Sequence, residues 1–550
     1  MDIVDCRLKL SPPLYAAYVA RDAALFSARY DHDPWAEATW EKRAAELMEA
    51  HYPRADREAL GAALFAYNRK VENGEAALAN IAALSRGEAL AVVGGQQAGL
   101  FTGPLFVIYK ALTVIQLARK LAERLGRPVV PVFWIAGEDH DFDEVNHVYS
   151  LTPELDIQKI AIPHPHPDRR TAVSRLEIPQ DALRAALDVF LETLPDSEFK
   201  PAIAERLSSI VAASRTLVDV FARVFAWLLG SEGLVLIDSD DPNVRRLERP
   251  LFRRLIEEAE GLRRALLDGE AAVRALGYAP QLEIAPESAN IFLHEGGERV
   301  LLYGEDGAFF DRRARLRFDR EALTALVAAH PERFSANVAT RPLMQEYLFP
   351  VLAAVLGPSE VAYWAELREA FHFMTMRVPP LVPRFQATVV EPALEKALAA
   401  FGCEAARAVG DAGYIEACQA AWFRSQSDVQ SLEARFEAVK ADIRALYEPL
   451  IAEVGAMEKG LGPLGEENLR KILGHVDFLQ SRALAAKRTQ FDSALRRFAR
   501  IRQMFAPLGK TQERVLNVFH FVNRHGVAWI RPFLEAPLPL DGRHRLVYWR

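Results

Sequence analysis

Short apolar runs alternate with longer amphipathic stretches along the first part of the chain. The run "ALAVVGG" at 89–95 stops at two glycines, and "RPVVPVFWIAG" at 127–137 ends before an acidic loop. Residues 104–125 between them place apolar side chains at helical spacing, with Pro104 suited to the first helical position. The pattern predicts a strand–helix–strand unit of about 45 residues with a right-handed parallel crossover, which is typical of doubly wound α/β folds.

Further apolar runs extend this α/β pattern. "GLVLIDSDDP" at 233–242 predicts another buried strand, and the helix after it begins at Pro242. Two β-rich runs around "HEGGE" predict a hairpin over 278–305, and we expect a last core strand near 359–364. The other expected elements are helices over 34–85 and insertions over about 151–230 and 265–335.

The apolar spacing changes near the C-terminus. Seven apolar residues step by three and four, as the a/d seam of a coiled coil does: Val429, Leu432, Phe436, Val439, Ile443, Leu446 and Leu450. "GLGPLG" at 460–465 separates this helix from a second one over about 466–506, which predicts an antiparallel hairpin. Because two helices alone leave apolar surface uncovered, we expect the hairpin to mediate a homodimer. An internal helical domain is the alternative.

These patterns predict three regions. The core with its insertions covers 1–385, and an α-helical coiled-coil domain covers 386–515. The segment 516–550 returns to the core, where its end "HRLVYWR" forms a short strand.

Composition and charge exclude several classes of protein. The 550 residues are 50% hydrophobic and 26% charged, as in a folded chain. The net charge of −7 argues against a sequence-independent nucleic-acid binder. No apolar run is long enough for a membrane span, and the first residues lack the cationic segment of a signal peptide. Three scattered cysteines favour a cytoplasmic location and argue against a disulfide scaffold or a zinc ribbon.

The loop after the first strand, "GGQQAGLFTGP", has the composition of an anion-binding turn. Glycines let a ligand approach the backbone, and N–H groups at the start of the next helix favour phosphate or carboxylate. The loop lacks the GK[ST] of a Walker A motif and is not GxGxxG, so a tight structural turn is the alternative. The candidate binding residues are Gly94, Gly95, Gln96, Gln97, Thr102 and Gly103, with Lys110 as a cation that could point back.

The acidic loop after the second strand, "AGEDHDFDEVNH", allows three interpretations. In a substrate site, Glu138, Asp139 and Asp141 hold an ammonium group or a magnesium–nucleotide while His140 moves a proton, and Trp134 precedes them. A transition-metal site would use the pairs four residues apart, His140 with Glu144 or Asp143 with His147. A solvated acidic helix start is the third. The buried strand aims the loop at the cleft, which favours the substrate site.

A third polar group lies within "FSANVATRPLMQEYLFPVLAAVLGPSEVAYWAEL". Arg341 could clamp a carboxylate or phosphate, or form a structural ion pair with Glu346. The other candidates to line or back the cleft are Asn337, Gln345, Glu360, Tyr363 and Trp364. A second nucleotide pocket could form where "PPLVPRF" meets the C-terminal strand, with Arg384, Asn523 and Tyr548.

Together, these segments resemble one family, the cysteine-adding ligases of bacillithiol biosynthesis. The matching strings run from about residue 90 to the C-terminus: "GGQQAGLFTGPLFVIYK", "PVFWIAGEDHDFDEVNH", "GLVLIDSDDP", "FSANVATRPLMQEYLFPVLA", "GPSEVAYWAEL", "PPLVPRF" and "VNRHG…HRLVYWR". The resemblance implies a Rossmann-like core related in architecture to class I aminoacyl-tRNA synthetases. It also implies a C-terminal coiled coil that mediates dimers.

The reaction that the resemblance implies joins the carboxyl group of cysteine to the amino group of glucosaminyl-malate, the last step of the pathway. A carboxylate reacts with an amine only after activation, so we expect ATP with magnesium, through an acyl-adenylate or an acyl-phosphate, and no tightly bound cofactor or structural metal. The expected catalytic residues are His140, which would act on the attacking amine, and Asp139 and Asp141; Arg341 would hold an anionic group such as the malate. Another nucleotidyl-transfer enzyme and a non-catalytic nucleotide-binding coiled-coil dimer are the alternatives.

Overall fold

The computed structural model describes residues 1–49, 51–313 and 315–550. The chain divides into two compact units. The core unit comprises Val4–Ala387 and Glu513–Arg545, and the helical unit comprises Met1–Ile3, Thr388–Gln512 and Leu546–Arg550. Within the described residues, no helix combines the length and apolar character needed to cross a membrane.

Five parallel strands form the central sheet of the core unit, and their residues are almost all buried. In sheet order they are β13 (Leu381–Pro383), β12 (Val351–Leu356), β2 (Leu90–Gln96), β3 (Val129–Ile135) and β6 (Val235–Asp238). Strands buried on both faces read as continuous apolar runs, as these do. The predicted strand–helix–strand unit is confirmed as β2, α6 (Phe106–Leu125) and β3, although Pro104 precedes the helix.

The strand order reverses beside β2. From β2 the chain adds β3 and then β6 on one side, and later adds β12 and β13 on the other. The connections that leave β2 and β12 therefore diverge at the carboxyl ends of these strands, which opens the crevice where doubly wound sheets bind ligands.

Buried asparagines close the open edge of β6. The Asn68 side chain accepts a hydrogen bond from Leu236 N (3.0 Å) and donates one to Leu236 O (2.8 Å), as a neighbouring strand would. Asn73 donates to Asn68 Oδ1 and to Leu234 O. These side chains come from α4 (Arg57–Lys70) and the turn after it, so helix α4 is fixed to the sheet edge through polar contacts.

A five-stranded sheet of antiparallel pairs, in the order β10-β9-β8-β7-β11, belongs to the core unit as well. Its strands are β7 (Ser288–Glu295), β8 (Glu298–Glu305), β9 (Ala308–Phe310), β10 (Arg317–Asp319) and β11 (Phe334–Ala336). The predicted hairpin is confirmed as β7 and β8, which join through Gly296 and Gly297, both with positive φ. A smaller hairpin pairs β4 (His147–Leu151) with β5 (Ile157–Ala161).

The prediction of a strand near 359–364 is wrong. The preceding apolar run forms β12, and α15 (Pro358–Trp364) occupies the expected range. Glu360 accepts a hydrogen bond from Gly357 N (2.7 Å), and Pro358 takes the first helical position, so "GPSE" acts as a helix start. The segment lies in an apolar-rich stretch of the sequence, which is equally typical of a buried strand and of a buried helix.

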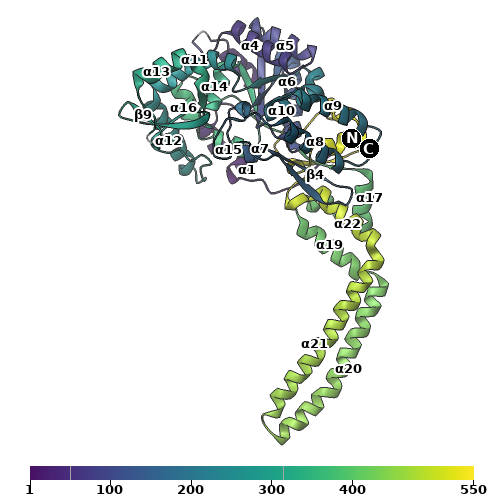
Figure 1. Ribbon diagram of the computed structural model, residues 1–550. Helices are drawn as coiled ribbons and strands as arrows, with labels where there is room; N and C mark the ends of the chain where they lie inside the picture. The colour runs from purple at the N-terminus through teal and green to yellow at the C-terminus, as the bar shows by residue number, and fades with distance from the viewer. Residues whose placement is uncertain (50, 314) are drawn as a thin grey trace. The chain divides into compact units, whose positions relative to one another are not determined.

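The remaining helices of the core unit surround these sheets (Figure 1). They are α1 (Pro13–Val19), α2 (Ala23–Arg29), α3 (Thr39–Glu46), α5 (Glu75–Ser85), α7 (Phe142–Val145), α8 (Gln180–Thr193), α9 (Lys200–Ala212), α10 (Leu217–Leu229), α11 (Pro242–Glu257), α12 (Ala259–Ala275), α13 (Arg320–Ala329), α14 (Arg341–Leu348), α16 (Arg368–Phe373), α23 (Phe519–His525) and α24 (Arg531–Glu535).

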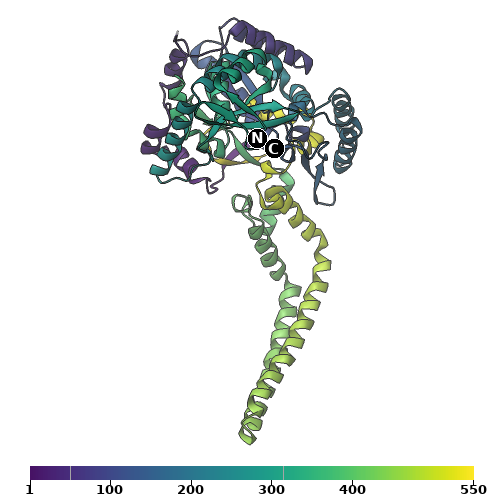
Figure 2. The same cartoon turned by 60° about the vertical axis from the view of Figure 1, so that its left-hand side comes forward.

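The helical unit is dominated by a long hairpin of α20 (Ser427–Met457) and α21 (Leu461–Arg488), which lie side by side in Figures 1 and 2. Lys440 contacts Asp477, and Tyr447 contacts Asn468, so the helices run antiparallel as predicted. The second helix is interrupted at 489–491 before α22 (Asp492–Phe505). The unit also contains α17 (Pro392–Phe401), α18 (Ala405–Ala408), α19 (Ala412–Arg424) and parts of a three-stranded sheet of β1 (Asp2–Asp5), β15 (His544–Tyr548) and β14 (Gln386–Val390).

Replacing Asn68 tests the edge closure. Asn68→Leu would leave the N–H and C=O groups of Leu236 buried without partners, which should lower the free energy of unfolding by about 2–4 kcal/mol. Urea unfolding of the whole chain measures this. The control is Asn80→Ala, which removes one half-buried hydrogen bond to Gly233 O and should cost about 1 kcal/mol. Equal costs for the two variants would contradict the edge-closing role.

Candidate functional site

A cavity of about 530 Å³ lies at the carboxyl ends of the central strands, beside the reversal of strand order. Its volume falls within the roughly 300–1,000 Å³ typical of small-molecule sites. The walls come from β2, β3, β12 and the segments that follow them, from the β7–β8 hairpin, and from α14: Val93, Gly94, Gly95, Gln96, Gln97, Trp134, Ala136, Glu138, Asp139, Phe292, Arg299, Leu301, Ala336, Asn337, Val338, Arg341, Gln345, Leu356, Glu360 and Tyr363.

The loops after β2 and β3 meet at this cavity. Gln97 Nε2 donates to Asp139 Oδ2 (2.7 Å) and to Glu144 Oε2 (2.5 Å), which joins the glutamine loop to the acidic loop. Asp139 Oδ1 also accepts from the backbone N of His140 (2.7 Å). The second glutamine of the pair thus bridges the two strand ends without adding charge.

Lys110 points back from α6 to the end of β2, but its ammonium group is fully engaged. Its Nζ donates to Gly95 O (2.7 Å), Gln96 Oε1 (3.0 Å) and Glu360 Oε2 (2.5 Å). Burial lowers the pKa of Lys110, and the Glu360 carboxylate opposes that shift. All three donors are used, so Lys110 fixes Gln96 and Glu360 at the cavity wall and does not line the cavity itself.

Arg341 lines the cavity and has no carboxylate within ion-pair distance among the described residues. Its guanidinium donates to Gln345 Oε1 (3.0 Å) and lies 3.4 Å from the Tyr363 hydroxyl. The alternative ion pair with Glu346 is wrong, because Glu346 is paired with Arg43 and accepts from the Tyr52 hydroxyl instead. Arg341 therefore keeps N–H groups for a ligand.

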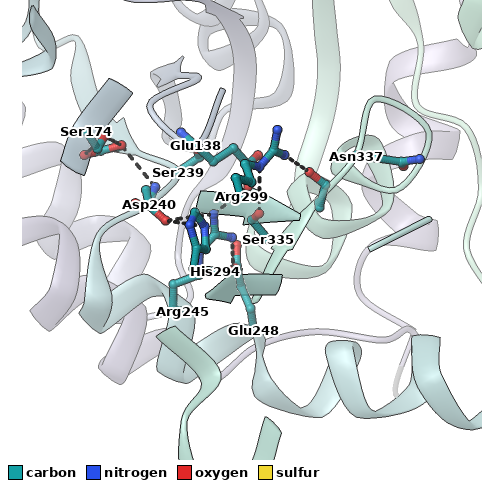
Figure 3. Close-up of polar contacts among 12 residues, drawn as sticks. Glu138, Ser174, Ser239, Asp240, Arg245, Glu248, His294, Arg299, Ser335 and Asn337 are labelled. Carbon is teal, nitrogen blue, oxygen red and sulfur yellow. Dashed lines mark hydrogen bonds and ion pairs between the residues drawn. The ribbon is translucent and has the colours of Figure 1, made fainter. Parts of the chain in front are cut away.

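A second arginine, Arg299 of β8, was not among the predicted site residues. It is 7% exposed and donates to Ser335 Oγ (2.9 Å) and Ala336 O (2.6 Å). Its guanidinium lies over the Phe292 ring at 3.8 Å and 3.0 Å from His140 Nδ1. Figure 3 shows Arg299 between Glu138 and Ser335. It has no acidic partner within ion-pair distance in the described part of the chain.

Beneath the cavity lies a buried network of charges (Figure 3). Arg245 donates to Glu138 Oε2 (2.5 Å) and Glu248 Oε2 (2.6 Å), and Arg175 holds Asp240 with two hydrogen bonds. Burial, opposed by Arg245, raises the pKa of Glu248 to about 8. The network fixes Glu138 at the cavity wall from one side.

The end of β6 packs tightly against the acidic loop. Ser174 Oγ donates to Asp238 (2.7 Å), and a Cβ on Gly137 would lie 2.1 Å from Asp238 Oδ1, so only glycine fits there. Burial raises the pKa of Asp238 to about 7, and Asp240 adds to the shift.

Several predicted residues lie at or behind the cavity rather than in its wall. His140 borders it through Arg299, and Asp141 is exposed. Trp364 is fully buried. Trp134 does line the cavity, and its buried indole N–H has no hydrogen-bond partner among the described residues.

Thr102 and Gly103 form a turn instead of a ligand cradle. Phe101, Thr102 and Gly103 all have positive φ, which is strained for the first two. Asn517 holds the turn by donating to Phe101 O (2.8 Å) and Gly103 O (2.7 Å). The tight-turn alternative therefore holds for this half of the loop.

The residues of the second predicted pocket are not part of this cavity. Arg384 is buried in an ion pair with Glu513 (2.8 Å), and Asn523 donates to Pro195 O (2.8 Å). Tyr548 ends strand β15.

The transition-metal alternative needed side chains four residues apart on one helix. Helix α7 spans only Phe142–Val145; His140 precedes it, and His147 begins β4. The required helical spacing is therefore not formed, and the described residues contain no group of three or more metal-ligating side chains.

The raised pKa of Asp238 makes a pH prediction. Because the folded value is about 7 and the ordinary value is 3.8, this carboxyl group contributes stability that is full below about pH 4 and is lost as the pH rises to about 7. The free energy of unfolding of Asp238→Asn, relative to that of the wild type, should therefore rise by about 2–3 kcal/mol between pH 5 and pH 8. Urea unfolding at both pH values measures this difference. A stability difference that does not change with pH would contradict the burial of a titrating carboxyl group here.

Comparison with known proteins agrees with the resemblance. The family model "Bacillithiol biosynthesis BshC, N-terminal Rossmann-like domain" matches residues 1–385, and "Bacillithiol biosynthesis BshC, C-terminal coiled-coil domain" matches residues 387–549. A Geobacillus kaustophilus protein named "Putative cysteine ligase BshC" is 40% identical over 510 residues, 92% of each chain. A Bacillus cereus protein of the same name is 34% identical over 511 residues, 93% of this chain and 94% of the relative.

Among solved structures, a chain titled as a putative arginyl-tRNA synthetase from Campylobacter jejuni covers 80% of this chain and 98% of its own length. Its identity of 11% and TM-score of 0.22 carry no argument about function or fold. The predicted fold class, a Rossmann-like α/β core with a C-terminal coiled-coil hairpin, is confirmed by the family models and by the parallel sheet. The chain belongs to the BshC family of bacillithiol biosynthesis.

Proposed function

We propose that this protein is an ATP-dependent ligase that joins the carboxyl group of cysteine to the amino group of glucosaminyl-malate. The names of the relatives support a cysteine ligase. The observation that carries the proposal is the pair of arginines, Arg299 and Arg341, which line one cavity and have no carboxylate within ion-pair distance among the described residues. A guanidinium taken out of water needs an anion nearby, so this cavity suits an anionic substrate.

The cavity offers a place for each reacting part. Arg341 and Arg299 would bind the malate carboxylates or a phosphate group. Gly94 and Gly95 also line the cavity, although the space left by their missing side chains is occupied by Val114 and Trp134. Asp139 is the carboxylate best placed to hold an amino group, since it lines the cavity and, among the described residues, its only side-chain hydrogen-bond donor is the neutral Gln97.

The same residues fit the phosphate groups of ATP, which when bound would make the cysteine carboxyl group reactive toward the amine. Magnesium in nucleotide sites needs only one or two protein carboxylates beside the phosphates. Asp139 and Glu360 line the cavity and could supply them. Asp141 is exposed and would act only if the acidic loop moved.

The direct test incubates the purified protein with cysteine, glucosaminyl-malate and ATP and follows the product by mass spectrometry. Formation of bacillithiol together with ATP consumption supports the proposal. ATP turnover only with a different acceptor would indicate another nucleotidyl-transfer enzyme. ATP binding without any turnover would indicate a non-catalytic nucleotide-binding protein.

Arg341→Met tests the anion site within this function. Loss of charged hydrogen bonds of about 1.5–3 kcal/mol should raise the KM for glucosaminyl-malate or for ATP by roughly 10–150-fold. The matched control is Arg333→Met, because Arg333 precedes β11 and is paired with Glu295 at a partly exposed position away from the cavity. Unchanged KM values for both substrates would remove Arg341 from the binding site.

We further propose that the chain forms a homodimer through the α20–α21 hairpin. Large apolar side chains of both helices are exposed: Val439, Leu446, Leu450, Met457, Leu464, Phe478 and Leu479. So many exposed large apolar side chains on one hairpin favour a second chain as their cover.

Changing this apolar face tests the dimer. Leu446 is 78% exposed and Leu479 is 61% exposed, so the double variant Leu446→Glu, Leu479→Glu should place charges in the interface. Analytical ultracentrifugation should show a dimer for the wild type and for the control Glu448→Gln, and a weaker dimer for the double variant. A monomeric wild type would contradict the proposal.

A further inference from the structure

The contact between Arg299 and His140 constrains where the histidine can carry its proton. Arg299 Nη1 lies 3.0 Å from His140 Nδ1. A guanidinium is always charged and offers only donors, so Nδ1 must present its lone pair. A neutral imidazole whose Nδ1 accepts a hydrogen bond carries its proton on Nε2.

Other contacts hold the arginine in this position. Its Nε and Nη2 atoms donate to Ser335 and Ala336 of β11, while its face stacks on Phe292 of β7. The guanidinium is therefore fixed by two strands before it meets the histidine, and it cannot turn away without losing buried hydrogen bonds.

The charges around His140 are mixed. Burial lowers its pKa, and Arg299 and Arg170 lower it further, while Asp139 and Asp141 act in the opposite direction. The nearest carboxylate atom, Asp139 Oδ1, is 4.0 Å from Nδ1 and is already bound to the backbone N of His140. Protonation would bring a second cation to the guanidinium at hydrogen-bond distance.

We infer that Arg299 is a positioning residue that holds His140 as the neutral Nε2–H tautomer, so that His140 donates a hydrogen bond to an anionic substrate group instead of acting as a base. Nε2 makes no hydrogen bond with the described residues, and the side chain remains 22% exposed. The expectation that His140 takes a proton from the attacking amine fails on this account, because its only basic nitrogen is occupied.

The tautomer does not depend on the proposed ligation, whereas the identity of the anion rests on it. A carboxylate of malate and a phosphate group share the chemistry that an N–H donor recognises. Arg299 and Arg341 line the cavity, whereas His140 borders it behind Arg299, so its Nε2–H would meet such an anion at the edge of the cavity.

Nitrogen NMR of the full-length protein labelled at histidine tests the tautomer directly. The His140 signals are assigned by their absence in His140→Gln. In the wild type we expect a protonated Nε2 and an unprotonated Nδ1 at pH 7–8. A proton on Nδ1, or an imidazolium at pH 7, would overturn the inference even if the enzyme proved to be the proposed ligase.

Arg299→Met tests the role of the arginine. Without the guanidinium, His140 should sample both tautomers and titrate closer to the ordinary histidine value of about 6.5. Arg299→Lys, which keeps a charged donor, should restore the wild-type tautomer. Ser335→Ala is the matched control, since it removes another contact of Arg299 without touching His140 and should leave the tautomer unchanged. An unchanged tautomer in Arg299→Met would overturn the positioning role.

Two probes test the donor role in the wild type. Titration with inorganic phosphate and, separately, with malate should shift the proton signal of Nε2–H, and the probe that acts at lower concentration identifies the anion class. No shift with either probe would overturn the donor role.

Variants of His140 test the donor role in the ligation assay. His140→Gln should keep more activity than His140→Leu, because the amide of glutamine still donates a hydrogen bond. Equal losses of activity in the two variants would contradict donation by His140.

Discussion

Buried positive charge is the constraint that organises this site. Several of the described cationic side chains reach the carboxyl ends of the central strands, and they differ in their partners. Arg245 and Lys110 are matched with carboxylates, which fixes Glu138, Glu248 and Glu360 in place. Arg299 and Arg341 have no carboxylate within ion-pair distance among the described residues. Arg245 and Lys110 fix the wall of the cavity. Arg299 and Arg341 make the cavity positively charged, which favours an anionic ligand.

The surrounding fold supplies the rigidity that this arrangement requires. Asparagines close the edge of β6, and Asn517 holds the strained turn at 101–103 that leads into α6. Helix α6 in turn delivers Lys110 to the end of β2. The segment around Asn517 therefore stabilises the loop after β2, which forms part of the cavity wall, although Thr102 itself does not line the cavity.

The local pattern of apolar and polar residues predicted those parts of the site that are formed by residues close together in the sequence. Two apolar runs stopped by glycine identified β2 and β3, and the rule for parallel sheets then brought Gln97 and Asp139 together. Contacts between distant residues could not be predicted this way. Arg299 meets His140 across 159 residues, and Lys110 meets Glu360 across 250. The helix that starts at Pro358 was predicted as a strand because it lies in an apolar-rich stretch, where buried strands and buried helices look alike. A capping glutamate three residues after Gly357 was the signal that could have found it.

The central claim is that Arg299 and Arg341 together form the binding site for the anionic part of the substrate. An experimentally determined structure of the protein with glucosaminyl-malate tests it most directly. We expect a malate carboxylate within hydrogen-bond distance of both guanidinium groups. A substrate bound with its carboxylates at any other place in the molecule would contradict this binding role for the two arginines.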